Sequence, residues 1–206
     1  EFNGEVQSLT DKLKVKAQKI SEEMNRKGMR VLAVAQKSYI EKVGNFSVSD
    51  EKEMVLIGFL AFLDPPKPSA AEAIKQLYEY GVEVKILSGD NDIVVKAIGR
   101  QVGIDTSYSL TGPDIENMDE TILKERVKTT TCFSKLTPLQ KTQIISILQE
   151  QENTVGFLGD GINDAAALRQ SDIGISVDSA VDIAKESADI ILLEKDLMVL
   201  EDGVLE

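Results

Sequence analysis

Histidine is absent from this sequence of 206 residues, and cysteine occurs only once, as Cys132. Without histidine, a catalytic mechanism in this chain cannot depend on an imidazole group. A single cysteine can form neither a disulfide within the chain nor a metal site made of several thiolates, and this usage is typical of a reducing cytosol. Any catalytic site must therefore be built from other groups.

Long apolar runs and an excess of positive charge are also missing. No apolar run reaches the ~18 residues needed to span a bilayer, and nothing resembles a signal peptide, so we expect the chain by itself to be soluble. The 35 acidic residues outnumber the 23 basic ones and give a net charge of -12. This balance argues against binding to a nucleic-acid backbone.

Helical and strand patterns alternate along most of the chain. Apolar residues spaced by three and four predict a helix over Val6–Lys27, ended by Gly28. Strands follow at Arg30–Ala35 and Met54–Leu63, with a loop or hairpin over residues 40–52. Later helices are predicted at Ala70–Tyr80, Asp92–Val102, Asp119–Val127, Pro138–Gln151, Ala180–Ser187 and from about Asp196. The later strands are Val82–Leu87, Thr130–Phe133, Val155–Leu158, Ile173–Val177 and Asp189–Leu193, with a turn at Gly112-Pro113. This alternation predicts an α/β fold, a parallel sheet with helices on both faces.

A proline-rich stretch separates two parts of the chain. In the run Asp64-Pro65-Pro66-Lys67-Pro68, each proline fixes φ and lacks a backbone donor, which stiffens the segment. We place a domain boundary near this stretch and assign residues 1–57 to one domain and residues 58–206 to another.

The stretch Val155–Leu168 carries the strongest functional signal. A short apolar strand ends in Gly159-Asp160-Gly161, and an alanine-rich helix follows. Ligands of parallel sheets collect beyond the carboxyl ends of the strands, so Asp160 is expected to point into that crevice. Asn163 and Asp164 stand at the start of the helix, either as simple caps or as part of a site. Two carboxylates and an amide there suit Mg²⁺.

Two further positions are candidates for phosphate binding. Ser88-Gly89-Asp90 ends a predicted strand and could offer a hydroxyl and amides to phosphate oxygens, although a plain strand-to-helix turn explains the tripeptide by itself. Lys141 lies early in the helix that Thr137 and Pro138 open. Alone, it is more simply a solvated surface lysine.

Together these residues resemble the haloacid-dehalogenase-like superfamily and, within it, the P-type cation-transporting ATPases. Gly159–Asp164 with Ala167-Leu168 is similar to the GDGxND hinge motif of the pumps, and Ser88-Gly89-Asp90 stands where most members have Thr-Gly-Asp. Lys141 matches the lysine of the P-x-x-K element. Gly58–Lys67 and Ala188–Lys195 look most like bacterial magnesium-transporting members.

The resemblance also implies identities for the two parts. The residues Asp64, Pro65, Pro66 and Lys67 look like the link between a nucleotide-binding and a phosphorylation domain. Residues 1–57 would be a small α+β remnant of the first, and residues 58–206 the Rossmann-like major part of the second. Gly28–Ala33 is similar to the end of the nucleotide-binding domain, where an arginine, here Arg30, reaches ATP phosphates.

For the mechanism, the resemblance implies an aspartate that attacks the γ-phosphate of ATP, with Mg²⁺ as cofactor. Asp160 would ligate Mg²⁺ directly and Asp164 would support its water shell. Lys141 and Ser88, with Gly89 and Asp90, would hold phosphoryl oxygens, and Asn163 would help to order the site.

One departure is as informative as the matches. The family places its nucleophile in Asp-Lys-Thr-Gly-Thr, and this sequence does not contain that motif. We therefore expect an excised piece of a pump that neither autophosphorylates nor transports. The parent protein would use ATP and a cation, reach the membrane through helices outside this chain, and work at the cytoplasmic face of the bacterial plasma membrane.

The missing nucleophile strand has a structural consequence. In the family it lies between the strands that here end at Ser88 and at Asp160, and its loss would leave two unpaired edges. Three outcomes stay open: a rearranged strand, dimerisation through the open edges, or a loose region. Other readings are a calcium or other cation pump, a soluble phosphatase of the same superfamily, and a non-catalytic binding module.

Overall fold

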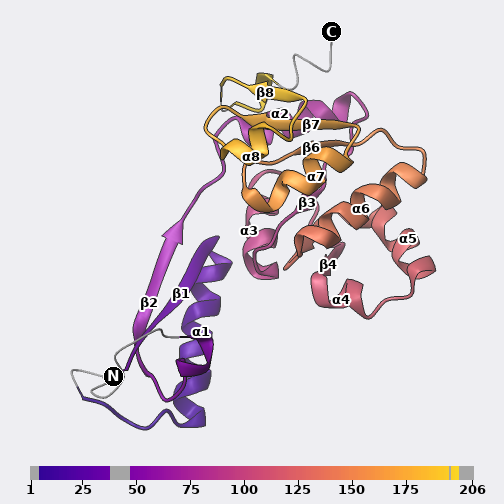
Figure 1. The fold of residues 1–206 in the computed structure, drawn as a ribbon. Helices are drawn as coiled ribbons and strands as arrows, with labels where there is room; N and C mark the ends of the chain where they lie inside the picture. The colour runs from indigo at the N-terminus through magenta and orange to yellow at the C-terminus, as the bar shows by residue number, and fades with distance from the viewer. Residues whose placement is uncertain (1–4, 38–46, 195, 200–206) are drawn as a thin grey trace. The chain divides into compact units, whose positions relative to one another are not determined.

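The structure, a computed structural model, describes residues 5–37, 47–194 and 196–199 (Figure 1). Contacts divide the chain into two compact units, with the division between Asp64 and Pro65. The boundary predicted between residues 57 and 58 falls inside strand β2 (Val55–Leu63), which pairs from end to end with strand β1 (Met29–Gln36). Because the pairing ties all of β2 to β1, the contacts change only after its last residue. The proline-rich link follows at once and has no regular secondary structure.

The first unit contains one long helix beside the antiparallel β1–β2 sheet. Helix α1 (Asp11–Arg26) begins later than predicted because the Thr10 hydroxyl caps it, accepting a hydrogen bond from the Leu13 amide at 3.4 Å. Gly28 follows the helix with a φ of 80°, a left-handed conformation that suits glycine.

The predicted loop between the two strands is only partly described. Residues 40–46 of it lie outside the described part of the chain, and Val48–Asp50 form the short 3-10 helix η1.

The second unit is an α/β unit, as predicted. Its helices are α2 (Ala70–Glu79), α3 (Asp92–Gln101), α4 (Gly112–Glu116), α5 (Glu120–Thr129), α6 (Pro138–Glu150), α7 (Ala165–Gln170) and α8 (Asp182–Lys185), with the 3-10 helix η2 (Ile162–Asp164) before α7. Its strands are β3 (Ile86–Leu87), β4 (Ser109–Thr111), β5 (Cys132–Ser134), β6 (Gly156–Leu158), β7 (Ile173–Val177) and β8 (Ile190–Leu192). Every strand pair in this unit is parallel. No helix among the described residues combines the length and apolarity needed to cross a membrane.

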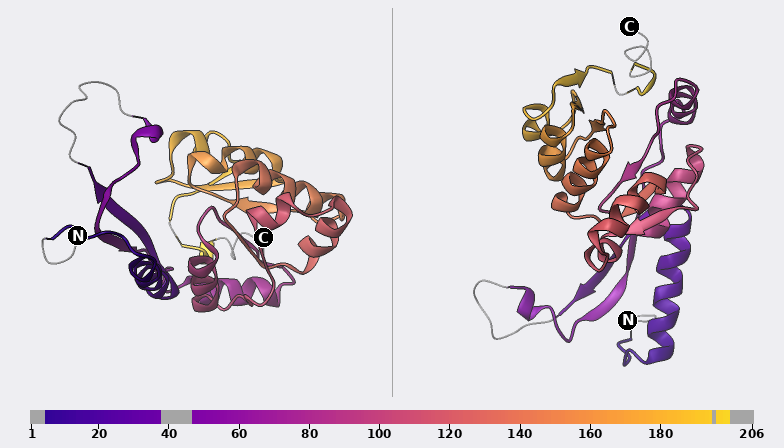
Figure 2. Two further views of the ribbon diagram at one scale, coloured as in Figure 1. Left: turned by 90° about the horizontal axis from the view of Figure 1, so that it is seen from below. Right: turned by 90° about the vertical axis from the view of Figure 1, so that its right-hand side faces the viewer.

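The strands of the second unit form two separate sheets (Figure 2). We name β3-β5-β4 the first half-sheet and β6-β7-β8 the second half-sheet. β3 and β6 are both edge strands and share no ladder in the described part of the chain. These are the strands that end at Ser88 and near Asp160, so the rearrangement in which they pair directly is not seen. Dimerisation through these edges stays a prediction.

Helix α6 connects the cores of the two half-sheets. Ile144 and Ile147 belong to a buried cluster with Phe133 of the first half-sheet. Ile145 belongs to another cluster with Phe157 of the second half-sheet, and Leu87 packs against both clusters. Burying an isoleucine side chain stabilises a fold by about 1.5–3 kcal/mol, so α6 is a substantial link across the interrupted sheet.

The turn predicted at Gly112-Pro113 is wrong, because these residues begin helix α4. The Thr111 hydroxyl accepts a hydrogen bond from the Asp114 amide, and the Asp114 carboxylate accepts one from the Thr111 amide. This reciprocal cap starts a helix where proline is tolerated, in the first turn. Strand β4, three residues long, was not predicted at all.

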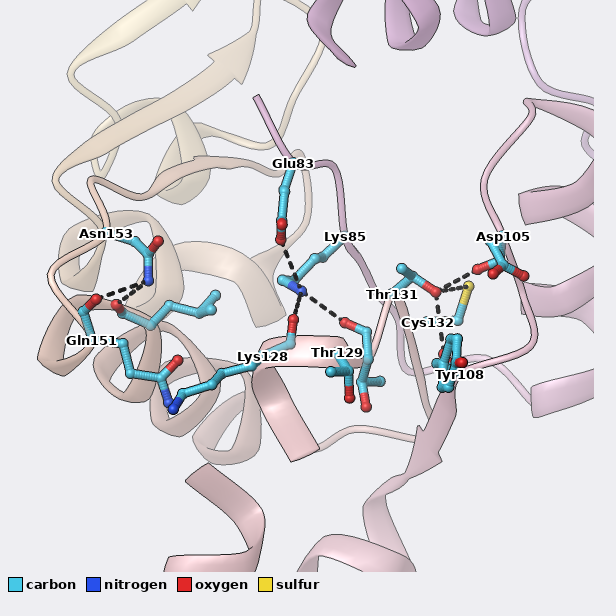
Figure 3. Close-up of polar contacts among 12 residues, drawn as sticks. Glu83, Lys85, Asp105, Tyr108, Lys128, Thr129, Thr131, Cys132, Gln151 and Asn153 are labelled. Carbon is cyan, nitrogen blue, oxygen red and sulfur yellow. Dashed lines mark hydrogen bonds and ion pairs between the residues drawn. The ribbon is translucent and has the colours of Figure 1, made fainter. Parts of the chain in front are cut away.

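At the amino ends of the strands in the first half-sheet, side chains hydrogen-bond to backbone carbonyls (Figure 3). The Lys85 ammonium donates to the carbonyls of Lys128 and Thr130 at 3.0 and 2.9 Å and thereby caps the end of α5. The Thr131 hydroxyl lies against the carbonyls of Asp105 and Tyr108. These polar groups serve the fold, and ligands of parallel sheets bind beyond the opposite, carboxyl ends of the strands.

Candidate phosphate and magnesium site

The turn after β6 is tightly packed. A Cβ atom at Gly159 would lie 2.6 Å from the Asp164 Cβ and 3.0 Å from the ring of Phe157, so only glycine fits. The Gly161 amide donates to Oδ2 of Asp164 at 3.1 Å. Asp164 therefore folds back over the turn and fixes it, but its side chain does not cap the alanine-rich helix α7, the role that the sequence left open.

Lys141 and Asp164 form a largely buried ion pair. The Lys141 Nζ lies 2.6 Å from Oδ1 of Asp164, and the two side chains are 11% and 14% exposed. The pair joins α6 to the start of α7. Removing one partner of such a pair leaves an uncompensated charge and costs about 3–5 kcal/mol, so the contact defines the geometry strongly.

Local capping sets the position of Lys141. The Thr137 hydroxyl accepts from the Gln140 amide, while the Gln140 side chain accepts from the Thr137 amide at 2.9 Å and donates to the Gly112 carbonyl at 2.9 Å. These bonds anchor the first turn of α6 to the first half-sheet. Lys141, the next residue, then reaches Asp164 in the turn that follows β6 of the second half-sheet.

The Ser88-Gly89-Asp90 loop is fixed against the end of β5. The Ser88 carbonyl accepts from the Leu136 amide at 3.1 Å, and the Asp90 carbonyl accepts from the Lys135 amide at 2.7 Å. Within the loop, the Ser88 hydroxyl accepts from the Asp90 amide at 3.1 Å. Asp90 does not cap α3, because Asn91 takes that role.

Asp160 and Asn163 are exposed at the same turn. The Asp160 carboxylate makes no hydrogen bond or ion pair with any residue that the structure describes, whereas both Asp164 oxygens are engaged. No group of three or more acidic, histidine or cysteine residues suited to a metal occurs in the described ranges. Mg²⁺ usually takes only one or two carboxylates and keeps several waters. The residues present fit that pattern: Asp160 would be the direct ligand, and Asp164, whose oxygens are both engaged, would support it from behind.

The predicted residues fall into three places. Lys141, Asp164 and the Asp160 turn come together, and Ser88 is linked to them through Leu136 and the start of α6. Arg30 lies on β1 of the first unit, opposite Phe62. Asp64, Pro65, Pro66 and Lys67 form the stretch at the division between the units.

Sequence reasoning missed Ser176 in β7. Ser176 is fully buried, and its hydroxyl donates to the Gly159 carbonyl at 2.9 Å. A serine inside the apolar strand Ile173–Val177 was the available signal.

Comparison with known proteins finds relatives among the cation-transporting ATPases. The magnesium-transporting ATPase, P-type 1, of Escherichia coli (strain K12) is 48% identical over 204 residues, which cover 99% of this chain and 23% of that protein. A protein of the same name from Salmonella typhimurium (strain LT2) is 55% identical over 189 residues, covering 90% and 21%. Calcium-transporting ATPase 1 of Lactococcus lactis is 30% identical over 205 residues, covering 98% and 23%.

The chain thus spans less than a quarter of the length of these relatives. The predicted resemblance to magnesium-transporting P-type ATPases is confirmed over nearly the whole chain. The family profile described as haloacid dehalogenase-like hydrolase matches residues 7–172, which include the Ser88 loop, Lys141 and the Asp160 turn. The chain belongs to the haloacid dehalogenase-like hydrolases.

Proposed function

We propose that this chain is part of a P-type ATPase, an ATP-driven cation pump, and that its second unit holds the phosphoryl group and Mg²⁺ during phosphoryl transfer. Magnesium is the transported ion that we favour. The observation that carries the proposal is the 2.6 Å contact between Lys141 and Asp164. It brings the lysine of one motif, on α6, to the carboxylate of another motif, in the turn that follows β6.

The residues divide the work by charge. The carboxylate of Asp160 is free to ligate Mg²⁺, and Asp164 orients the same turn while it holds Lys141 in place. Lys141 offers a buried positive charge to phosphoryl oxygens, and Ser88 with the Gly89 amide offers neutral donors from the other half-sheet. Asn163 is exposed beside Asp160 and helps to order ligands there. When bound, Mg²⁺ would neutralise charge on the transferred phosphoryl group.

The first unit and the link complete the proposal. Arg30 is exposed on β1 and would contact ATP phosphates. Asp64, Pro65, Pro66 and Lys67 would act as the hinge between a nucleotide-binding and a phosphorylation domain. Residues 1–57 and 58–206 are our domain assignment by function. The break in contacts comes slightly later, between Asp64 and Pro65.

The nucleophilic aspartate would come from outside this chain. No Asp-Lys-Thr-Gly-Thr motif is present, and β3 and β6 share no ladder in the described residues, which suits a strand inserted between them. We therefore propose that the chain alone forms no aspartyl-phosphate and transports nothing. In the parent pump, at the cytoplasmic face of the bacterial plasma membrane, the reaction would be ATP hydrolysis coupled to cation movement.

Two measurements test this proposal. Incubation of the 206-residue chain with Mg²⁺ and ATP labelled in the γ-phosphate should give no acid-stable phosphoenzyme, whereas the complete protein from the same gene should be labelled. Lys141→Ala in the complete protein should reduce that labelling by at least ~100-fold, because positioning and charge supply most of the catalysis. Labelling of the chain alone would refute the missing nucleophile, and normal labelling of the variant would refute the role of Lys141.

The metal ligand is tested on the chain itself. Addition of Mg²⁺ should shift the backbone NMR signals of Asp160 and Gly161, and Asp160→Asn should abolish that shift. Asp11→Asn is the matched control, because it makes the same chemical change at a side chain that is 98% exposed. An equal response of both variants would mean that Mg²⁺ binds only by general charge.

A further inference from the structure

We propose that Ser176 is a positioning residue for Asp160: its buried hydroxyl fixes the peptide group that precedes Asp160 and so sets the direction of the metal-binding carboxylate. The inference rests on the proposed function of Asp160 as a Mg²⁺ ligand. It adds a residue from β7 to a site whose other members lie on the loops and on α6.

The geometry holds Gly159 at both of its polar groups. The Gly159 amide donates to the Ile175 carbonyl at 3.0 Å, which extends the β6–β7 ladder by one bond. The Ser176 hydroxyl donates to the Gly159 carbonyl at 2.9 Å. Two consecutive residues of β7, Ile175 and Ser176, therefore bond to Gly159. The Ile175 bond continues the backbone ladder, and the Ser176 bond comes from a side chain beyond the end of the ladder.

This grip acts on Asp160 through the covalent chain. The Gly159 carbonyl and the Asp160 amide belong to one planar peptide group, so a bond to the carbonyl fixes the whole plane. On the other side, the Asp160 carbonyl accepts from the Val181 amide at 3.2 Å. Both peptide planes that flank Asp160 are thus held by hydrogen bonds. The backbone of Asp160 is therefore fixed, while its side chain is exposed.

The burial of the Ser176 hydroxyl also argues for a specific role. It is fully buried within an otherwise apolar strand. Burying a hydroxyl is unfavourable unless it finds a partner, and alanine would avoid that cost. The Gly159 carbonyl is the partner that the described residues provide, so the serine makes sense as a fastening for the turn.

The experiment compares two buried serines of the same unit. Ser176→Ala removes the bond to the turn. Ser171→Ala removes a similar bond, because Ser171 is only 9% exposed and its hydroxyl donates to the Leu168 carbonyl at 2.8 Å. Mg²⁺ alone is titrated into the 206-residue chain and followed by NMR. Loss of a residue behind a metal ligand typically weakens binding by ~10-fold or more, so we expect that increase in the Mg²⁺ dissociation constant for Ser176→Ala only.

Further variants keep the outcomes distinct. Ser176→Thr retains the hydroxyl and should restore the affinity of the parent chain. An unchanged dissociation constant in Ser176→Ala, or an equal loss in Ser171→Ala, would overturn the proposal, because only a general effect of core polarity would then remain.

A second readout separates this inference from the proposed function. If the parent chain and Asp160→Asn respond identically to Mg²⁺, Asp160 is not the ligand and the proposed function fails. Hydrogen exchange of the Gly161 amide then decides the role of Ser176 in the turn. Faster exchange in Ser176→Ala than in Ser171→Ala supports the fastening, and equal rates in the two variants reject it.

Discussion

The two half-sheets of the second unit hold their carboxyl-end loops in different ways. In the first half-sheet, the Ser88–Asp90 loop is tied to β5 and the residues after it mainly by backbone hydrogen bonds. Among the residues that the structure describes, the Ser88 hydroxyl bonds only within the loop, to the amide and carboxylate of Asp90. In the second half-sheet, the side chains of Asp164 and Ser176 hold the turn by hydrogen bonds, and the Asp160 carboxylate is exposed there. In our proposal, the first loop faces the phosphoryl group and the second turn faces the metal ion.

This difference between the two half-sheets explains why helix α6, which packs against both, is important for the site. A donor loop and a carboxylate turn on separate sheets can act on one phosphoryl–metal complex only if something fixes one sheet relative to the other. α6 contributes apolar residues to both cores, and Lys141 at its start pairs with Asp164. The lysine therefore serves both as a link and as the positive charge between the two halves.

The largest expected effect comes from breaking this link. Asp164→Ala leaves the buried Lys141 ammonium without its partner, and we expect the free energy of unfolding to fall by about 3–5 kcal/mol in urea titrations. Lys141→Met combined with Asp164→Leu removes both charges and should cost less than the sum of the single changes.

The exposed pair Lys14–Asp11 provides the control for this prediction. Its side chains are 59% and 98% exposed, so Asp11→Ala should cost less than about 1 kcal/mol. An Asp164→Ala variant as mild as Asp11→Ala would mean that water screens the inner pair too, and α6 would lose its special part in joining the halves.

Long, regular elements could be predicted from the sequence because their signals are local. Strand β7 was predicted with both of its ends, and α6 within one residue, since Thr137 and Pro138 mark its start. Strand β4 was missed because three residues are too few to show an alternation of apolar and polar side chains. The helix at Gly112 was mistaken for a turn because the cap formed by Thr111 and Asp114 is a matter of side-chain geometry.

For the site, the residues could be predicted but not their partners. The motif resemblance selects Lys141, Asp160 and Asp164 one by one, and only folding shows that the lysine pairs with Asp164 while Asp160 stays exposed. The grip of Ser176 on Gly159 joins residues 17 apart in sequence. Such contacts depend on the register of β6 against β7, which no local pattern specifies.

A smaller effect is expected from adding one methyl group to the turn of the second half-sheet. Gly159→Ala places a Cβ atom 2.6 Å from the Asp164 Cβ, which cannot move without disturbing the Lys141 pair. Overpacking of this kind costs about 1–3 kcal/mol in unfolding free energy. It should also weaken Mg²⁺ binding, because Asp160 is the next residue.

Gly156→Ala is the matched substitution for Gly159→Ala. It lies earlier in the same segment, and its nearest neighbours would be 3.9 and 4.0 Å away, an ordinary contact distance. We expect little loss of stability and no change in the Mg²⁺ response. Similar losses for both variants would show that β6 tolerates no side chain at all, rather than that the turn is crowded by Asp164.

The smallest effect concerns the acid sensitivity of the first half-sheet. The hydroxyl and the amide of Thr111 both donate to the Asp114 carboxylate and lower the pKa of that group. The hydroxyl has the larger effect. A lowered folded-state pKa means that the stabilising contribution is present above the unfolded value of about 3.9 and is lost as the pH falls through the folded value. Because Asp114 is exposed, solvent screening limits the contribution to less than about 1 kcal/mol.

Asp114→Asn tests that contribution because it keeps the shape of the side chain and removes its titration. Unfolding free energies of the parent chain and the variant should differ at pH 7 and converge as the pH falls below the folded-state value. A constant difference across this range would assign the stability of the β4–α4 corner to its neutral hydrogen bonds. In that case the two half-sheets would differ in their loops but not in their dependence on ionised carboxylates.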